Sequence, residues 1–153
     1  FPSATEIPKL QVLGPEPLTE DFDTRYLYPR LKASSKEIKP FLLDQRLVAG
    51  IGNIYASEIL FASGVLPQRS SHSLKKKEVQ AIVENTRRIL LSAIEYNGTS
   101  VSDFRQVDEK TGEFQNFLQV YDKESQPCPR CEVPLQRIVQ QQRSTFFCIG
   151  CQK

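Results

Sequence analysis

The sequence contains no methionine, no tryptophan and no long hydrophobic run. A membrane-spanning helix needs about 20 consecutive apolar residues, and no stretch of this chain approaches that length. The first residues also lack the charged and apolar regions of a signal peptide. We therefore expect a soluble intracellular protein that has no membrane partner. Because translation begins with methionine, its absence further predicts that the chain is part of a longer protein.

Histidine and glycine are scarce. The one histidine, His72, lies in a polar stretch, and we expect it to be neither a metal ligand nor a base. The seven glycines form neither a Walker phosphate loop nor a complete dinucleotide-binding fingerprint. Proline is concentrated at the start, where residues 1–18 hold four of the ten. Because proline removes N–H donors and interrupts helices, this stretch is predicted to be a linker from a missing N-terminal domain.

Charge of one sign is not in large excess, since the formal net charge is +2. The cationic residues are nevertheless clustered, at Lys32, Lys36, Lys39 and Arg46, at 75–77, and at Arg130, Arg137 and Arg143. Such clusters can form a stripe that faces phosphate, or they can lie on solvated helix faces. Charge alone does not separate these two interpretations.

Cysteine is sparse, but its four copies form two Cys-x-x-Cys pairs, Cys128 with Cys131 and Cys148 with Cys151. Sixteen residues separate the pairs, a spacing typical of a four-cysteine zinc site. Thiolates suit zinc, and four protein ligands leave no coordination position for water. We therefore predict one structural Zn²⁺ ion. A disulfide framework or a redox-active pair is the alternative, although four cysteines in 153 residues are few for a disulfide framework.

Apolar periodicity and capping residues predict a mainly helical fold before the cysteines. We expect a first helix from Thr19, as N-cap, that Pro29 limits or kinks, and a second from Pro40 to about Val48. A third should begin after Asn53, as N-cap, and stop at Gly64, and a fourth should run from about Lys75 to Tyr96. The longest helix carries apolar residues at the three-and-four spacing of a core-facing stripe. The stripe consists of Val79, Ile82, Val83, Thr86, Ile89, Leu90, Ala93 and Ile94.

The second half of the chain is predicted to be less regular. Residues 99–115 show no clear periodicity and are expected to form a long loop. Residues 117–121 are predicted to be a short strand or a packed connection. Residues 135–139 and 144–147 are predicted to be the two strands of a zinc-pinned hairpin with a polar tip.

The segment Gly50-Ile51-Gly52-Asn53 joins two of the expected helices. Glycine lets another chain approach the backbone closely, and free N–H groups at the start of a helix favour phosphate. The segment is therefore a candidate anion site. A plain corner between helices, with Asn53 as the N-cap, is the alternative.

Several separated motifs together resemble one family. The run from Ile38 to Glu58, IKPFLLDQRLVAGIGNIYASE, resembles the helix-two-turn-helix motif of formamidopyrimidine-DNA glycosylases. The segments LGPEPL at 13–18, LQVY at 118–121, QRSTFFC at 142–148 and CQK at 151–153 match the same family in order. The resemblance covers nearly the whole chain. It implies a helix-two-turn-helix DNA-binding domain at 19–122, followed by a four-cysteine zinc finger at 123–153.

The resemblance also implies a reaction and partners. The family acts in base excision repair as a DNA glycosylase and abasic-site lyase, and it removes oxidised purines such as 8-oxoguanine and formamidopyrimidines from double-stranded DNA. Its nucleophile is an N-terminal proline on a catalytic domain that this sequence does not match, whereas Pro2 here is acylated by Phe1. We therefore expect a monomer in the bacterial cytoplasm that binds damaged DNA but is not a glycosylase by itself. The alternative is a free-standing, non-catalytic zinc-containing nucleic-acid-binding module.

The site residues follow from the same resemblance. Lys39, Gly52 and Asn53 are expected to contact phosphate near the lesion, and residues 102–112 to close over the extruded base. Arg143 is expected to grip the flanking phosphates and to donate a proton in the final elimination. Because arginine stays ionised at ordinary pH, the phosphate contact suits it better than proton donation. Basic residues are common in the family where Ser34 and Ser35 stand here, so some phosphate contact would either be lost or shift to Lys32 or Lys36.

Overall fold

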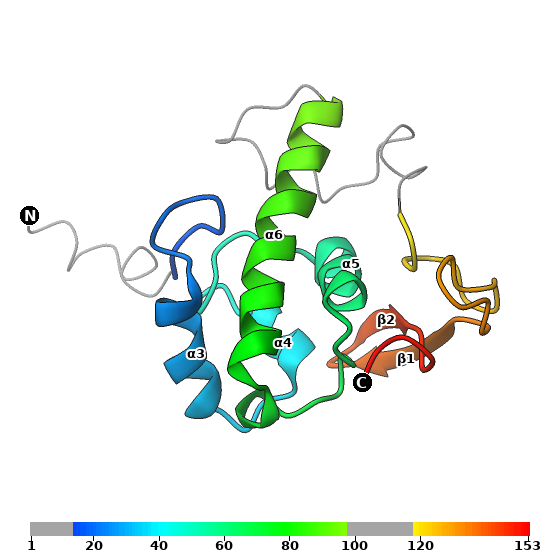
Figure 1. Ribbon diagram of the computed structural model, residues 1–153, viewed down its shortest axis with the longest axis horizontal. Helices are drawn as coiled ribbons and strands as arrows, with labels where there is room; N and C mark the ends of the chain where they lie inside the picture. The colour runs from blue at the N-terminus through cyan, green and yellow to red at the C-terminus, as the bar shows by residue number, and fades with distance from the viewer. Residues whose placement is uncertain (1–13, 98–117) are drawn as a thin grey trace, which may run out of the picture.

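The computed structural model describes residues 14–97 and 118–153, with the backbone alone at 95–97 (Figure 1). In that part of the chain four α-helices and a short 3-10 helix precede a two-stranded antiparallel sheet. Their bounds are α3 Thr24–Lys32, α4 Ile38–Leu43, α5 Asn53–Ser63, η1 Ser71–Ser73, α6 Lys76–Asn97, β1 Gln136–Gln140 and β2 Arg143–Phe147. The predicted class, a mainly helical fold followed by a small four-cysteine hairpin, is confirmed.

Helix α6 is the longest element and organises the helical core. It runs between α3 and α5 (Figure 1) and packs against both. Every residue of its predicted apolar stripe is buried. The three-and-four spacing therefore identified the core-facing side correctly, because that spacing places side chains on one side of a helix.

Helix α5 is buried on nearly all sides. All eight residues from Ile54 to Phe61 are buried, which is typical of a helix that has packing partners on opposite faces. Ile59 and Leu60 belong to the core formed with α3, α4 and α6. Phe61 belongs instead to a second core beside the cysteines, with Val120, Cys128, Leu135, Phe146 and Cys148. Helix α5 thus lies between the two cores.

The predicted helix ends are partly wrong. The first helix begins after Asp23, not Thr19, and the Asp23 carboxylate accepts the Tyr26 N–H at 2.8 Å. The Thr19 hydroxyl instead donates to the Glu16 carbonyl, so it caps no helix. Pro29 lies inside α3 without ending it. Helix α4 starts earlier and ends earlier than the predicted span of 40–48.

The ends of α5 gave one correct and one wrong expectation. The helix stops at Gly64, which has the predicted left-handed conformation with a φ of 72°. Its N-cap is Gly52 and not Asn53, which is the first helical residue. The preceding turn uses Gly50 at a φ of 90°, a conformation that residues with a Cβ rarely adopt.

Strands β1 and β2 form the predicted hairpin. Gln140 pairs with Arg143, so Gln141 and Gln142 alone make the turn. Both have positive φ, at 48° and 69°, as a type I′ hairpin turn requires. The turn places Arg143 directly beside the tip.

The connection into the hairpin is packed rather than extended. Residues 118–121 form no strand, and Val120 is fully buried. The predicted linker 1–18 lies mostly outside the described residues, as does the predicted loop 102–112. None of the described helices has the length and apolar character needed to cross a bilayer.

Candidate metal centre and nucleic-acid interface

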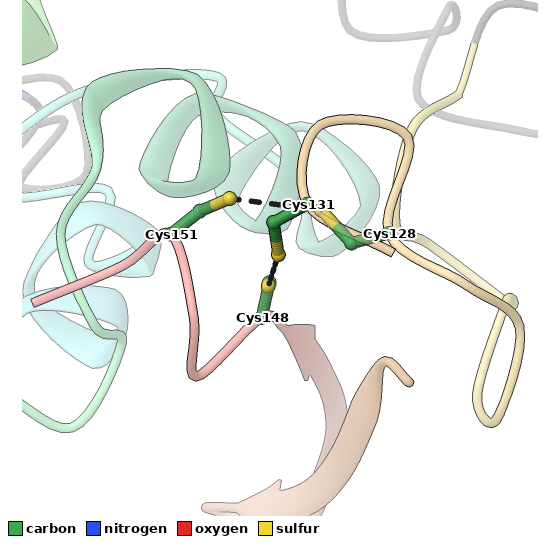
Figure 2. A group of neighbouring side chains, drawn as sticks. All are labelled: Cys128, Cys131, Cys148 and Cys151. Atoms are coloured by element: carbon green, nitrogen blue, oxygen red, sulfur yellow. Dashed lines mark hydrogen bonds between the residues drawn. The ribbon is translucent and has the colours of Figure 1, made fainter. Parts of the chain in front are cut away.

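The four cysteines converge beside the hairpin (Figure 2). Their sulfur atoms all lie within 4.8 Å of one another. The Sγ atoms of Cys128 and Cys151 are 3.7 Å apart, and those of Cys131 and Cys148 are 3.4 Å apart. These distances are far longer than a disulfide bond of about 2.05 Å, so the disulfide alternative is wrong for this arrangement. They match the sulfur separations around a tetrahedral ion with metal–sulfur bonds of about 2.3 Å.

The electrostatics of the cluster also suit a divalent cation. Burial acts to raise the pKa of Cys128, but the N–H groups of Arg130 and Cys131 and the neighbouring thiols outweigh it and lower this pKa to about 7. Burial and hydrogen bonds with the other sulfurs raise the pKa of Cys151 to about 12. Four thiolates would repel one another, and a bound metal supplies the positive charge that lets all four deprotonate. The residues therefore fit one structural zinc ion, which would cross-link the two Cys-x-x-Cys pairs.

A cleft of about 430 Å³ lies between the helical core and the hairpin tip. It is lined mainly by residues of α4, the 44–52 segment and the hairpin. Three predicted site residues, Lys39, Gly52 and Arg143, line this cleft. Lys36 and Arg46 add two further cations to the lining. The cleft is therefore a cationic groove next to the start of α5.

Arg143 is the cation most available to a ligand in this groove. It is exposed at the first position of β2, where the tight turn holds its backbone. Within the described residues its guanidinium has no hydrogen-bond or ion-pair partner. Its five N–H donors are thus free to bind a phosphate in two-pronged geometry.

Lys39 has a different environment from that expected of a cation that contacts DNA directly. The residue is fully buried. Its ammonium donates to the Asn53 amide oxygen, to the Thr145 hydroxyl at 2.8 Å and to the Ser144 carbonyl at 3.3 Å. The Asn53 amide nitrogen donates to the same Ser144 carbonyl at 3.0 Å. Lys39 therefore ties the first residue of α5 to the hairpin, and this network takes Asn53 away from the predicted capping role.

Asp44 sets the positions of the other two cations in the groove. Its carboxylate lies 2.8 Å from the Lys36 ammonium and 2.9 Å from Nη2 of Arg46. Hydrogen bonds from the Arg46 side chain are the main reason that the pKa of Asp44 falls well below its usual range. Lys36 and Arg46 are therefore held in place by a carboxylate that stays charged.

Glu58 is a structural residue that the sequence interpretation missed. Its carboxylate lies inside the protein and accepts the backbone N–H groups of Gln119, Val120 and Tyr121 at 2.8, 3.0 and 2.9 Å. Burial raises the pKa of Glu58, while the three N–H donors act in the opposite direction. A signal was present in the sequence, because Glu58 is the one charged residue in the otherwise uncharged run 53–64.

Comparisons with known proteins agree with this architecture. Residues 13–105 match the model of the formamidopyrimidine-DNA glycosylase H2TH domain, and residues 125–153 match that of the zinc finger found in FPG and IleRS. The chain is 48% identical over 141 residues to formamidopyrimidine-DNA glycosylase of Serratia proteamaculans, covering 92% of this chain and 52% of that protein. The chain therefore spans about half the length of the curated relatives it matches.

Solved structures show the same likeness. The MutM (Fpg) protein of Thermus thermophilus superposes with a TM-score of 0.83 at 43% identity, covering 97% of this chain and 57% of that one. Lactococcus lactis Fpg in complex with a DNA that contains FAPY-dG superposes with a TM-score of 0.84 at 37% identity. That match covers 99% of this chain and 55% of the Lactococcus chain.

Proposed function

Because the chain belongs to the formamidopyrimidine-DNA glycosylase family, we propose that it is the DNA-binding part of a base-excision enzyme that removes oxidised purines. The observation that carries the proposal is the cationic groove lined by Lys36, Arg46 and Arg143, with Gly52 at the start of α5. A groove lined by several cations suits a phosphate backbone, which is bound largely through charge. The Lactococcus lactis relative was solved with lesion-containing DNA, which supports a damaged duplex as the partner.

We assign the phosphate contacts by what each side chain is free to do. Arg143 is exposed and unpaired among the described residues, so it binds phosphate directly. Gly52 lets the backbone approach closely at the start of α5, where the helix dipole favours an anion. Asn53, in the same turn, is also assigned to the phosphate site, where its amide is oriented by Lys39 and the Ser144 carbonyl. Lys39 acts through Asn53, because its ammonium is already hydrogen-bonded inside the protein. It is therefore a positioning residue.

The chemical steps of base removal and strand cleavage are assigned to a larger protein of which this chain is proposed to be a part. The family's chemistry needs a free proline amine, and Pro2 is acylated by Phe1 in this sequence. We therefore propose that these 153 residues bind abasic or lesion-containing duplex as a monomer in the bacterial cytoplasm, and that an N-terminal catalytic domain supplies the nucleophile. A role of Arg143 as proton donor in the last elimination is part of the same proposal. The division of the chain into a linker at 1–18, a DNA-binding domain at 19–122 and a zinc finger at 123–153 is also part of this proposal.

Salt-dependent binding tests the proposal. The chain is titrated with duplexes that do and do not contain an abasic-site analogue, and strand cleavage and borohydride trapping are measured in the same samples. We expect binding without cleavage or trapping. Arg143→Ala should weaken binding to both duplexes and lower the slope of log K against log salt by about 1.

A matched variant on the same hairpin controls for charge and folding. Arg137 is exposed on β1 and bonds to the Ser144 hydroxyl, but it does not line the groove. Arg137→Ala should leave the salt slope nearly unchanged. Equal effects of the two variants would remove Arg143 from the phosphate contacts. Absence of all binding would overturn the proposed function, and trapping would show that an amine of this chain performs the chemistry.

A further inference from the structure

A second group of cations lies outside the groove. It consists of Lys32, at the end of α3, and Lys75, Lys76 and Lys77, at the start of α6, and we call it the α6 basic patch. All four residues are exposed. The 3-10 helix η1 brings them together, because the Lys32 ammonium donates to the His72 carbonyl at 3.1 Å and Lys75 follows two residues after η1.

One carboxylate among the described residues lies beside the patch, since Glu78 accepts the Lys75 backbone N–H at 2.8 Å and interacts electrostatically with Lys75. None of the four ammonium groups of the patch forms an ion pair within the described residues. The one acidic residue in the first turn of α6, Glu78, accepts Nη1 and Nη2 of Arg69 at 3.0 and 3.1 Å. Its ion pair is with Arg69, and Lys75 adds a weaker electrostatic interaction. The patch carries four positive charges on a chain whose net charge is only +2.

The position of the lysines does not serve the stability of the helix. The N-terminus of a helix is the positive end of its dipole, so cations there are unfavourable and acidic residues are favourable. Three adjacent lysines at this end also repel one another. A reason other than folding is therefore needed to explain them.

Hydrogen bonds connect the segment that carries the patch to the segment that lines the groove. The Ser71 N–H and hydroxyl of η1 donate to the Lys36 carbonyl at 2.7 and 2.8 Å, and the His72 N–H donates to the Ser34 carbonyl at 3.1 Å. Lys36 itself lines the groove. A single hydrogen-bonded junction therefore links the groove to the patch.

The surface of the patch suits phosphate better than a protein partner. Protein interfaces have an apolar centre, whereas the exposed residues around the lysines, His72 and Ser73, are polar. The exposed large hydrophobic residues of the described chain, Leu91, Val139 and Ile149, lie elsewhere in the sequence. A cluster of exposed ammonium groups suits the repeated charges of a nucleic-acid backbone.

We propose that the α6 basic patch is a second phosphate-binding surface, which extends the path of duplex DNA beyond the groove. This inference rests on the proposed function, since it assumes that DNA occupies the groove. The contacts are independent of base sequence, because lysine ammonium groups reach phosphates and read no base edge. The patch would thus lengthen the bound duplex without changing which lesion is recognised.

The test is the salt slope of binding as a function of duplex length. Undamaged duplexes of about 10, 15, 20 and 30 base pairs are titrated with wild type, with Lys76→Gln/Lys77→Gln and with Lys32→Gln. We expect the wild-type slope to rise with length until the patch is covered. In the double variant the slope on long duplexes should fall by roughly 1 to 2, at about 0.9 for each lost phosphate contact, while the shortest duplex should show little change.

The controls separate this inference from the proposed function. Arg25→Gln/Arg88→Gln removes two exposed positive charges of α3 and α6 outside the patch and should leave the slope at every length near that of wild type. Thermal unfolding should show that Lys76→Gln/Lys77→Gln is at least as stable as wild type, because the helix N-terminus disfavours lysine. Lys32→Gln, which leaves α6 unaltered, should lower the slope by up to about 0.9.

Each outcome has a distinct meaning. A length-dependent loss in the patch variants but not in the control pair supports the inference. If Arg143→Ala lowers the slope and the patch variants do not, the patch is not a DNA surface and the proposed function stands. If no variant and no duplex shows binding, the proposed function fails and the inference fails with it.

Discussion

At the scale of single residues, two cations with the same expected role have opposite environments. Lys39 and Arg143 were both predicted to contact phosphate, yet Lys39 is fully buried and Arg143 is exposed. A sequence shows that a residue is cationic but not which neighbours its charge will meet. The difference arises because the Lys39 ammonium of α4 reaches the Thr145 hydroxyl of β2 and the Asn53 amide of α5.

The buried carboxylate of Glu58 gives a prediction at this scale. In Glu58→Gln the amide NH₂ group replaces one acceptor oxygen and faces N–H donors of residues 119–121. We expect the free energy of unfolding to fall by about 1–3 kcal/mol, the cost of unsatisfied buried polar groups. The amides of these residues should also exchange their hydrogens faster. Urea denaturation and hydrogen exchange measure both effects.

A matched control for this change is Glu84→Gln, at an exposed position of α6. The Glu84 carboxylate accepts one long bond from Gln80, so its replacement should alter stability only slightly. If Glu58→Gln proved as mild as Glu84→Gln, the three backbone bonds would not be stabilising the connection.

Asp44 gives a prediction of pH dependence. Its pKa is lower in the folded protein than the unfolded value of about 3.9. The charged form therefore stabilises the fold above that value, and this contribution is lost as the pH falls through the folded-state pKa. Asp44→Asn lacks the contribution at every pH. We expect it to be less stable than wild type at pH 7 by up to about 1 kcal/mol, because Lys36 and Arg46 are partly exposed and solvent screens the pairs.

Urea denaturation at pH 7, 5 and 3.5 measures this dependence. The difference between wild type and Asp44→Asn should be constant from pH 7 to 5 and should narrow below about pH 4. A difference that stayed the same at the lowest pH would show that the ion pairs with Asp44 do not contribute.

At the scale of elements, the existence of the helices was predictable and their ends were not. The apolar stripe of α6 and the stop of α5 at Gly64 follow from local rules, and both are confirmed. The capping roles predicted for Thr19 and Asn53 were wrong because each side chain has a different partner. Thr19 bonds to Glu16 within a turn, and Asn53 bonds to the distant hairpin. A capping residue can be recognised locally, but its competing tertiary partner cannot.

The same limit applies to the candidate site. The four cysteines were predictable because their spacing is itself the signal, and their convergence is confirmed. The role of Glu58 could not be predicted, because it depends on hydrogen bonds to residues that lie 61 to 63 positions away in the sequence. Periodicity places Glu58 on a helix, but it does not show which backbone lies opposite.

The hairpin turn gives a prediction for an element. Gln142 has a φ of 69°, a region that costs residues with a Cβ about 1–2 kcal/mol. In Gln142→Gly this strain disappears, and we expect the free energy of unfolding to rise by about 0.5–1 kcal/mol after the larger entropy of the unfolded glycine is included. Thermal unfolding measures the change.

The comparison variant for the turn is Ser144→Gly, in the strand and outside the turn. Glycine within a strand loses conformational freedom without relieving strain, so this variant should be destabilised. A loss of stability in Gln142→Gly as well would mean that the turn does not keep its left-handed geometry in solution.

At the scale of the whole molecule, we expect DNA binding to depend on the metal, because the metal holds the hairpin that carries Arg143. A chelator should remove the zinc ion and release the two Cys-x-x-Cys pairs from each other, because the metal is the cross-link between them. We expect DNA affinity to fall at least as far as it does in Arg143→Ala, while most of the helical circular dichroism signal remains. Re-addition of zinc should restore binding. Full affinity after verified metal loss would contradict this expectation.

Helix α5 and the glycine that ends it are attached at four points to the zinc-bearing segment and to the connection that precedes it. The attachments run from Asn53, through Glu58, to the Phe61 carbonyl and ring under the Arg130 guanidinium. They end at the Gly64 carbonyl, which accepts the Lys153 N–H at 2.9 Å. A transplant of residues 123–153 into an unrelated scaffold would therefore leave behind the surface on which that segment is seated. A segment that is to be transferred to another protein therefore has to include α5 as well as the residues between the cysteines.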